Sequence, residues 1–189
     1  AGRMAAGFPV PLDGVVRGAV TCVPVVGSKR HDLALVTDAG SLMLIPGTGV
    51  EAQRLARIGK GAESGVAIAD LDADGEIELI AVGGDAGIYV LDRKGRTRRG
   101  FPYKMAFRAT GVPAIGDIND DGVPEILVGS QDFKIHAVDP AGRALGGFPL
   151  GATYRIYAGV ALGDLNGDGV VEGVVGSGDG KVYAFDGRG

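Results

Sequence analysis

The sequence predicts an all-β fold built from repeated four-stranded units, and three observations support this prediction. An acidic, glycine-containing motif starts at Asp70, Asp117 and Asp164, at equal intervals of 47 residues. Short apolar runs of strand length surround each copy, and no stretch shows the period of a helix. A period of roughly 40 to 50 residues with four strands per unit is typical of a β-propeller. The sequence therefore predicts one propeller domain over residues 1–189, with four-stranded antiparallel blades.

The motif itself has the composition of a calcium loop. Its copies span residues 70–78, 117–125 and 164–172, with Asp or Asn at positions 1 and 3, Gly at position 6 and Glu at position 9; position 5 is Asp in each copy. Ca²⁺ takes about six to eight oxygen ligands, which alternate positions of a tight loop can supply. The glycine accommodates a turn at positive φ. Position 7 varies in chemistry, as expected if only its backbone carbonyl coordinates.

The predicted ligands follow from these positions, and we expect about three calcium ions per chain. They are Asp70, Asp72, Asp74, Glu76, Glu78, Asp117, Asn119, Asp121, Val123, Glu125, Asp164, Asn166, Asp168, Val170 and Glu172. An EF-hand is disfavoured because its loop closes at position 12 between helices. The alternative is that Asp, Asn and Gly form simple turns between strands. Three copies in register favour calcium.

Strand signals recur in order along each unit. First strands are expected at 18–23 and, one repeat later, at 66–69 before the first acidic loop. Second strands are expected at 32–36, 79–82, 126–128 and 173–175, and third strands at 42–45, 88–91, 135–138 and 182–185. Gly-Phe-Pro at 7–9, 100–102 and 147–149 introduces a short outer strand, because proline suits an edge. The predicted blades are approximately 10–56, 57–103, 104–150 and 151–189, the last completed by residues 1–9.

Several single residues carry separate predictions. Cys22 lies in an apolar run and is expected to be a buried small side chain. His136 aligns with Leu42, Tyr89 and Tyr183, which predicts a packing role. The first repeat has lost the acidic loop, and the basic residues 29–31 in its place are expected to form a solvated turn.

Composition narrows the class of protein. The 189 residues include 46% hydrophobic and 22% charged residues, so the chain can bury a core. The 35 glycines have no collagen period and predict many tight turns. The net charge of −4, concentrated in the loops, gives no support to nucleic-acid binding. No signal peptide and no apolar run of membrane-spanning length is present, so no membrane insertion is expected.

The repeated pattern Gly-Val-x-x-x-Asp-x-Asx-x-Asp-Gly-x-x-Glu, followed by a strand, Tyr-x-x-Asp and Gly-Phe-Pro, resembles the FG-GAP/VCBS family of integrin-α-like propeller repeats. The resemblance covers essentially the whole chain and is weak in the first repeat. It implies that the calcium loops lie on one face and that ligands bind the opposite face. Residues expected there are Arg108, Arg155, Tyr154, Tyr157, Gln131 and Asp132. Asn119 and Asn166 replace an Asp, which should weaken two of the sites modestly.

Blade number and function stay open at this point. Four blades could close on themselves, two chains could form an eight-bladed ring as a homodimer, or the chain could be an excerpt of a longer propeller. The favoured function is a non-catalytic module that binds protein or glycan, with structural calcium and an extracellular, periplasmic or cell-surface location. The alternatives are an accessory module or fragment of a larger secreted or surface protein, and a polysaccharide-acting enzyme. The absence of a Ser-His-Asp order or a His cluster disfavours an enzyme.

Overall fold

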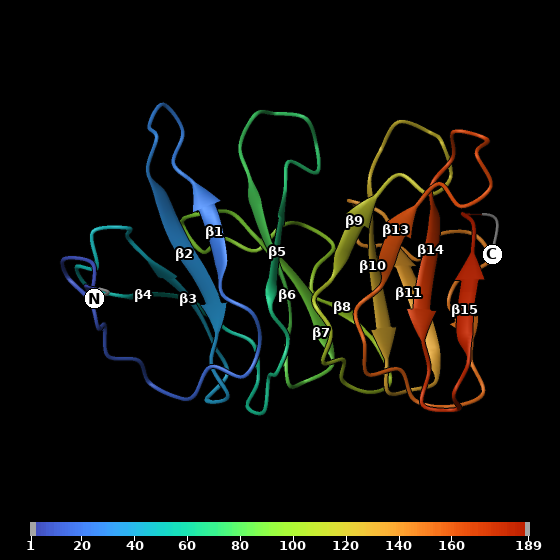
Figure 1. The fold of residues 1–189 in the computed structure, drawn as a ribbon, viewed down its shortest axis with the longest axis horizontal. Coiled ribbons are helices and arrows are strands. Elements are labelled where there is room, and N and C mark those ends of the chain that lie inside the picture. Colours follow the sequence, from blue (N-terminus) through green and yellow to red (C-terminus); the bar gives the residue numbers. More distant parts are fainter. Residues whose placement is uncertain (1–2, 188–189) are drawn as a thin grey trace.

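The computed structural model describes residues 3–187, which form fifteen strands and no helix. The strands make four antiparallel sheets, here called blades 1 to 4 (Figure 1). Blade 1 consists of β1 (Thr21–Pro24), β2 (His31–Val36), β3 (Ser41–Ile45) and β4 (Gln53–Arg57), and blade 2 of β5 (Val66–Ala69), β6 (Glu78–Val82), β7 (Gly87–Leu91) and β8 (Tyr103–Lys104). Blade 3 consists of β9 (Ala114–Gly116), β10 (Glu125–Ser130), β11 (Lys134–Val138) and β12 (Leu150–Gly151). Blade 4 consists of β13 (Ala161–Gly163), β14 (Glu172–Gly176) and β15 (Val182–Phe185). The all-β, four-stranded architecture predicted from the repeat is confirmed.

The middle strands read as continuous apolar runs because neighbouring blades cover both of their faces. Every residue of β3, β6 and β10 is buried. Separate apolar clusters fill the spaces between blades 1 and 2, 2 and 3, and 3 and 4. Blades 2 and 3 thus each contribute one layer of side chains to the core they share with the preceding blade and one to the core they share with the following blade.

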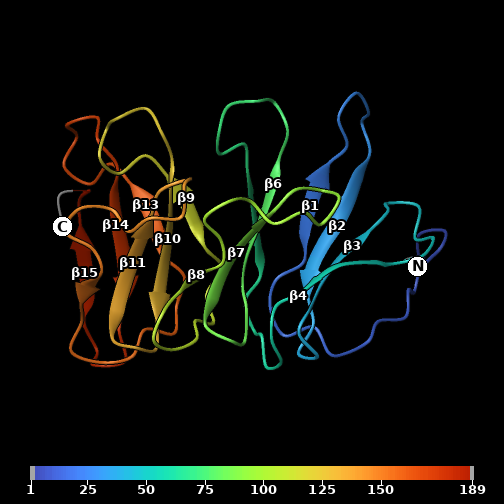
Figure 2. The same ribbon diagram turned by 180° about the vertical axis from the view of Figure 1, so that it is seen from behind.

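The blades stand side by side in chain order. The first strands β1, β5, β9 and β13 each contact the next, and they face the viewer in Figure 1, while the outer strands face the viewer in Figure 2. The two ends of the chain lie at opposite ends of this row (Figure 1). The arrangement is an open series, so a four-bladed ring closed within one chain is not formed.

The amino-terminal segment lies on a different blade from the one predicted. It was expected to add the outer strand of blade 4, but blade 4 has three strands within residues 3–187. Val10 and Leu12 instead pack against blade 1, on a cluster formed by Leu35, Met43 and Ile45. The apolar face of blade 1 is thereby covered by its own chain. Residues 1 and 2 of the expected strand lie outside the described part.

Two predictions for single residues need correction. Cys22 is exposed, because β1 alternates and places Val23 on the buried face. His136 is buried as predicted, yet its structural counterpart in blade 1 is Met43 and not Leu42. The pairing of Leu35 with Met43 and of Val128 with His136 shows that blade 1 is one residue shorter than the repeat.

The strand directions divide the loops between two rims. The acidic loops connect the first and second strands at the upper rim of Figure 1, and the turns between second and third strands lie at the lower rim. Within residues 3–187, no helix is long and apolar enough to cross a bilayer.

Candidate functional site

The three acidic loops share one hydrogen-bond pattern. In loop 70–78, the backbone N–H groups of Asp74 and Gly75 donate to the two carboxylate oxygens of Asp70 at 3.1 and 2.9 Å. The N–H of Leu71 donates to Glu78 at 2.9 Å, which ties the closing carboxylate to the start of the loop. The first Asp and the closing Glu accept corresponding backbone bonds in the other two loops. The backbone therefore fixes the first and last carboxylates of every loop.

The closing glutamates of loops 70–78 and 117–125 are buried. Burial raises the pKa of Glu125 to about 7, and the neighbouring charges of Asp121 and Asp117 act in the same direction. Burial also raises the pKa of Glu78. A nearby cation would favour the charged form of both groups.

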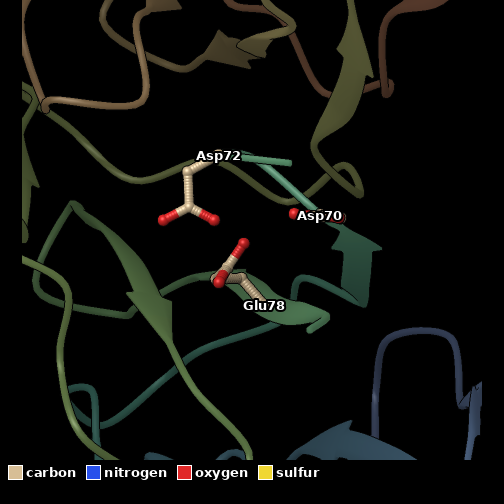
Figure 3. Close-up of side chains that lie close together, drawn as sticks. All are labelled: Asp70, Asp72 and Glu78. Carbon is tan, nitrogen blue, oxygen red and sulfur yellow. The ribbon is translucent and has the colours of Figure 1, made fainter. Parts of the chain in front are cut away.

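Loop 70–78 brings three carboxylates together. One oxygen each of Asp70, Asp72 and Glu78 lies within 4.8 Å of the others, and Figure 3 shows the side chains converging. Arg98 already contacts two of them, with its Nη1 2.8 Å from Asp72 Oδ2 and 3.7 Å from Glu78 Oε1. This guanidinium competes with any metal for the carboxylates of the loop.

The other two loops have an asparagine in place of the second carboxylate. Asn166 Nδ2 donates to Glu172 Oε1 at 3.0 Å, and its Oδ1 accepts from the N–H of Asp168 at 2.8 Å. Asn119 makes the same type of contact with Glu125, at 3.5 Å. The amide therefore faces the closing carboxylate, where rotation by 180° would exchange its donor for its oxygen.

Among the predicted ligands, the position-5 aspartates have a different role from the closing glutamates. Asp74, Asp121 and Asp168 each accept a bond at 2.8 Å from the N–H of position 7, which is Glu76, Val123 or Val170. The second oxygen of Asp121 accepts from Asn119 Nδ2 at 3.1 Å.

In the first repeat, an arginine side chain lies beside the β1–β2 connection, at the place where the other repeats have their acidic loops. Arg93, from the β7–β8 connection, pairs with Asp32 and donates to the Pro24 carbonyl at 3.0 Å. Asp32 stands opposite Val23, as Glu78 stands opposite Ala69. The basic residues 29–31 are exposed, as predicted for a solvated turn.

The opposite rim carries aromatic side chains on blades 3 and 4, here called the aromatic rim. It consists of Phe107, Phe133, Tyr154 and Tyr157, which are between 43% and 49% exposed. Phe133 and Tyr154 stack with centroids 5.9 Å apart and an interplanar angle of 23°. The guanidinium of Arg155 lies 5.7 Å from the centre of the Phe107 ring. Tyr154 and Arg155, which were predicted to bind a ligand, thus each contact a phenylalanine that was not predicted to do so.

Phe133 occupies an unusual backbone position. Its φ is +67°, a region that bulky side chains rarely adopt. The corresponding residues of the other turns between second and third strands are Gly40, Ala86 and Gly180. A large aromatic in a column of glycine and alanine was the signal in the sequence that could have found this residue.

The other predicted ligand-binding residues divide into two groups. Tyr157 is exposed and Arg108 is half-buried, and their backbones are tied to the rim by Thr110 and by Gln131. Gln131 is buried, and the side chain of Asp132 is only 6% exposed, so both support the rim from beneath and are not presented to a ligand.

A repeated polar pair holds the turns of this rim. Asp85 accepts from the hydroxyl of Tyr89 at 2.7 Å, and Asp179 accepts from Tyr183 at 2.7 Å. In blade 3 the pair is Asp132 with His136 Nε2, at 3.0 Å. Burial lowers the pKa of His136, and the negative charge of Asp132 partly opposes this shift. Burial, together with the hydrogen bond to Asp85, raises the pKa of Tyr89 to about 12. The buried Asp132 Oδ1 has no hydrogen-bond partner.

Structural comparison assigns the architecture. The computationally designed Ika4 protein matches with a TM-score of 0.63 and 16% identity, over 98% of this chain and 99% of Ika4. BBS1N, solved in complex with ARL6DN, matches with a TM-score of 0.64 and 16% identity, over 97% of this chain and 56% of BBS1N. BamB from Moraxella catarrhalis matches at 0.59 and 19% identity, over 92% and 50% of the two chains.

The chain has the β-propeller fold. It spans almost all of the designed propeller and about half the length of BBS1N and BamB. Neither family models nor curated proteins match the sequence. At these identities the likeness establishes the fold alone.

Proposed function

We propose that the chain is a non-catalytic, calcium-stabilised β-propeller of the FG-GAP/VCBS type that binds a glycan through its aromatic rim. The two parts of the proposal rest on different ends of the molecule. The acidic loops support the calcium part, and Phe133 with its neighbours supports the ligand part. A function must be argued from a site because one fold serves many functions.

The acidic loops fit calcium in their donor set. At positions 1, 3, 5 and 9, each loop has three or four carboxylates, which combine with a carbonyl or amide oxygen; these are the hard ligands that Ca²⁺ prefers. Among residues 3–187, no arginine forms an ion pair with the loops at 117–125 and 164–172, and these loops would accept the ion after the Asn amide turns. In loop 70–78, Asp70, Asp72 and Glu78 would hold the ion only if Arg98 moves away. When bound, calcium would supply the positive charge that compensates the negative charge of the buried carboxylates.

This fit supports a structural role for calcium and an extracytoplasmic location. A ligand that binds only the folded state stabilises it by about 2.7 kcal/mol per site at a hundredfold excess over Kd. Extracellular calcium modules have a Kd of roughly 10⁻⁴ to 10⁻³ M and are loaded where calcium is abundant. The proposed location is therefore periplasmic, extracellular or on the cell surface.

The single observation that carries the ligand part is the exposed Phe133 at φ +67°. Residues held in sparsely populated backbone regions cost on the order of 1–3 kcal/mol and concentrate at ligand sites. Its stacking on Tyr154 builds a wide aromatic surface, and the Arg155 guanidinium over Phe107 adds hydrogen-bond donors beside it. Aromatic faces with flanking donors suit the apolar faces and hydroxyl groups of a sugar ring.

A protein ligand is the second candidate. Tyr and Arg are enriched in protein-binding hot spots, and the rim offers both. BBS1N, a propeller-like neighbour in structure, was solved in complex with a protein, ARL6DN. An accessory role within a larger secreted or surface protein would use the same rim.

The ligand part is tested by replacing Phe133 with glycine, the residue found at two of the corresponding turns. We expect loss of binding to an array of neutral and acidic oligosaccharides, with stability changed by no more than about 1 kcal/mol because glycine adopts this φ freely. Tyr154→Ala should lose binding as well. The readouts are array fluorescence, calorimetric titration of the oligosaccharide retained most strongly, and thermal melting.

The control is Val26→Ala, at an exposed apolar residue in the β1–β2 loop of the other rim. It should leave binding unchanged. Binding that survives Phe133→Gly would contradict the rim as the ligand site. If the unaltered chain retains no oligosaccharide, the glycan proposal is wrong and a protein ligand becomes the test case.

A further inference from the structure

Two arginines flank the aromatic rim at the same position in neighbouring blades. Arg108 lies in the connection before β9 and Arg155 in the connection before β13, one repeat of 47 residues apart. The Arg108 carbonyl accepts from the N–H of Gln131 at 3.0 Å, and the Arg155 carbonyl accepts from the N–H of Gly178 at 2.9 Å. The two donors are themselves one repeat apart, so the same backbone bond fixes each arginine to a turn of its own blade.

Each of the two guanidinium groups extends toward the blade before its own. That of Arg155 lies 5.7 Å from the centre of the Phe107 ring, and Phe107 is the chain neighbour of Arg108. A Cβ atom placed on Gly61 would lie 3.8 Å from Arg108 Nη1. Gly61 is the position one repeat before Arg108. The two side chains therefore repeat one geometry and present their charges at an interval of one blade.

Within residues 3–187, neither guanidinium forms an ion pair with a protein carboxylate. The connections 105–113 and 152–160, which hold the two arginines, contain no aspartate or glutamate. The adjacent turns contribute Asp132 and Asp179, but Asp132 is bonded to His136 at 3.0 Å and Asp179 to Tyr183 at 2.7 Å. Uncompensated positive charge therefore lies beside the aromatic side chains, although the chain as a whole has a net charge of −4.

The aromatic surface and these charges alternate along the same connections. Tyr154, which stacks on Phe133, directly precedes Arg155 in the chain. Phe107 directly precedes Arg108. An aromatic face packs against the C–H face of a sugar ring, and the planar guanidinium forms two parallel hydrogen bonds with a carboxylate. A sugar ring that carries a carboxylate would use both kinds of group, whereas a neutral sugar would use mainly the aromatic part.

We propose that the aromatic rim binds an acidic oligosaccharide, with carboxylates of its uronic acid units on Arg108 and Arg155. This inference rests on the glycan-binding function proposed above and adds the charge class of the ligand. Hydrogen bonds between a guanidinium and a carboxylate are about twice as strong as neutral ones. Salt screens such contacts where they are exposed to solvent. Binding should therefore favour the charged over the neutral form of one sugar chain and should weaken as the ionic strength rises.

The test compares each acidic oligosaccharide with its own carboxyl-reduced form, in which the same sugar rings are neutral. The probes are short oligomers of galacturonate, glucuronate and mannuronate, together with sulfated galactan oligomers that lack uronic acid, titrated calorimetrically at low and high salt. We expect a uronate to bind at least about tenfold more tightly than its reduced form, and Arg108→Gln and Arg155→Gln each to weaken it at least about tenfold. Both variants should also reduce the salt dependence. Arg143→Gln, at an exposed arginine in the β11–β12 connection, is the matched control and should bind as the unaltered chain does.

The outcomes separate the charge class from the glycan-binding function itself. Equal binding of acidic and reduced forms, lost in Phe133→Gly, would overturn the acidic ligand and leave the glycan site standing. Uronate binding that both arginine variants retain would overturn it as well, because the carboxylates would then lie elsewhere. Preference for the sulfated oligomers would contradict the carboxylate assignment. If no oligosaccharide binds, the glycan function is wrong and the acidic ligand with it. Thermal melting of each variant distinguishes a lost contact from lost folding.

Discussion

Gly100→Ala is expected to destabilise the protein by about 3 to 5 kcal/mol, enough to lower Tm by at least roughly 6 °C. Gly100 has φ +93°, and a Cβ there would lie 1.9 Å from the Ala141 oxygen of the next blade. A non-glycine residue in this region already costs about 1–2 kcal/mol. The overlap adds to that cost, because the obstacle is backbone that can move only if blades 2 and 3 separate. Denaturant unfolding followed by far-UV circular dichroism measures the effect.

Gly180→Ala is the matched control. Gly180 has φ +79° but no atom within 4 Å of the added Cβ, so only the conformational cost of about 1–2 kcal/mol should remain. Equal losses in the two variants would show that the close approach between blades does not contribute. The comparison therefore isolates the contribution of the close backbone contact between blades 2 and 3.

Glu125→Gln is expected to change both the pH dependence of stability and the response to calcium. Burial raises the pKa of Glu125 to about 7, above the 4.5 of a glutamate exposed to water as in the unfolded chain. The folded state therefore holds the proton more tightly between these values. Its contribution to stability is present below pH 4.5 and is lost as pH rises through about 7. In calcium-free protein, the glutamine variant should lack this loss and be more stable than the unaltered chain at pH 8.

With calcium the order should reverse. The metal requires the charged carboxylate, and glutamine cannot supply it, so the variant should lose the stabilisation of one site, about 2.7 kcal/mol at a hundredfold excess over Kd. Melting curves at pH 5.5 and 8, with chelator and with calcium, measure both effects. Glu51→Gln, at an exposed carboxylate, should match the unaltered chain in all four conditions. A glutamine variant that retains full calcium stabilisation would contradict the ligand role of Glu125.

Local pattern predicted the strands well because each middle strand is covered on both faces and reads as an apolar run. The pairs of strands also follow from the regular spacing of the acidic loops. The one-residue shift in blade 1 was missed because the first repeat lacks the motif that anchors the alignment. Cys22 was misplaced because an apolar run does not reveal which face of β1 is buried.

The site could be predicted only where its residues are close in sequence. The carboxylates of loop 70–78 lie within nine residues of one another and do converge. Arg98 and Arg93 reach their acidic partners from other segments, 26 residues from Asp72 and 61 residues from Asp32. The stacking of Phe133 on Tyr154 joins two blades and likewise depends on the tertiary arrangement. Sequence spacing alone does not record such contacts.

Calorimetric titration of the chelator-stripped chain with calcium tests the central claim most directly. The account predicts three sites per chain, and the site at loop 70–78 should bind more tightly when Arg98→Leu removes the competing guanidinium from Asp72 and Glu78. The same titration should raise the melting temperature. An absence of calcium binding would show that the acidic loops are only turns between strands and would contradict the calcium-stabilised propeller.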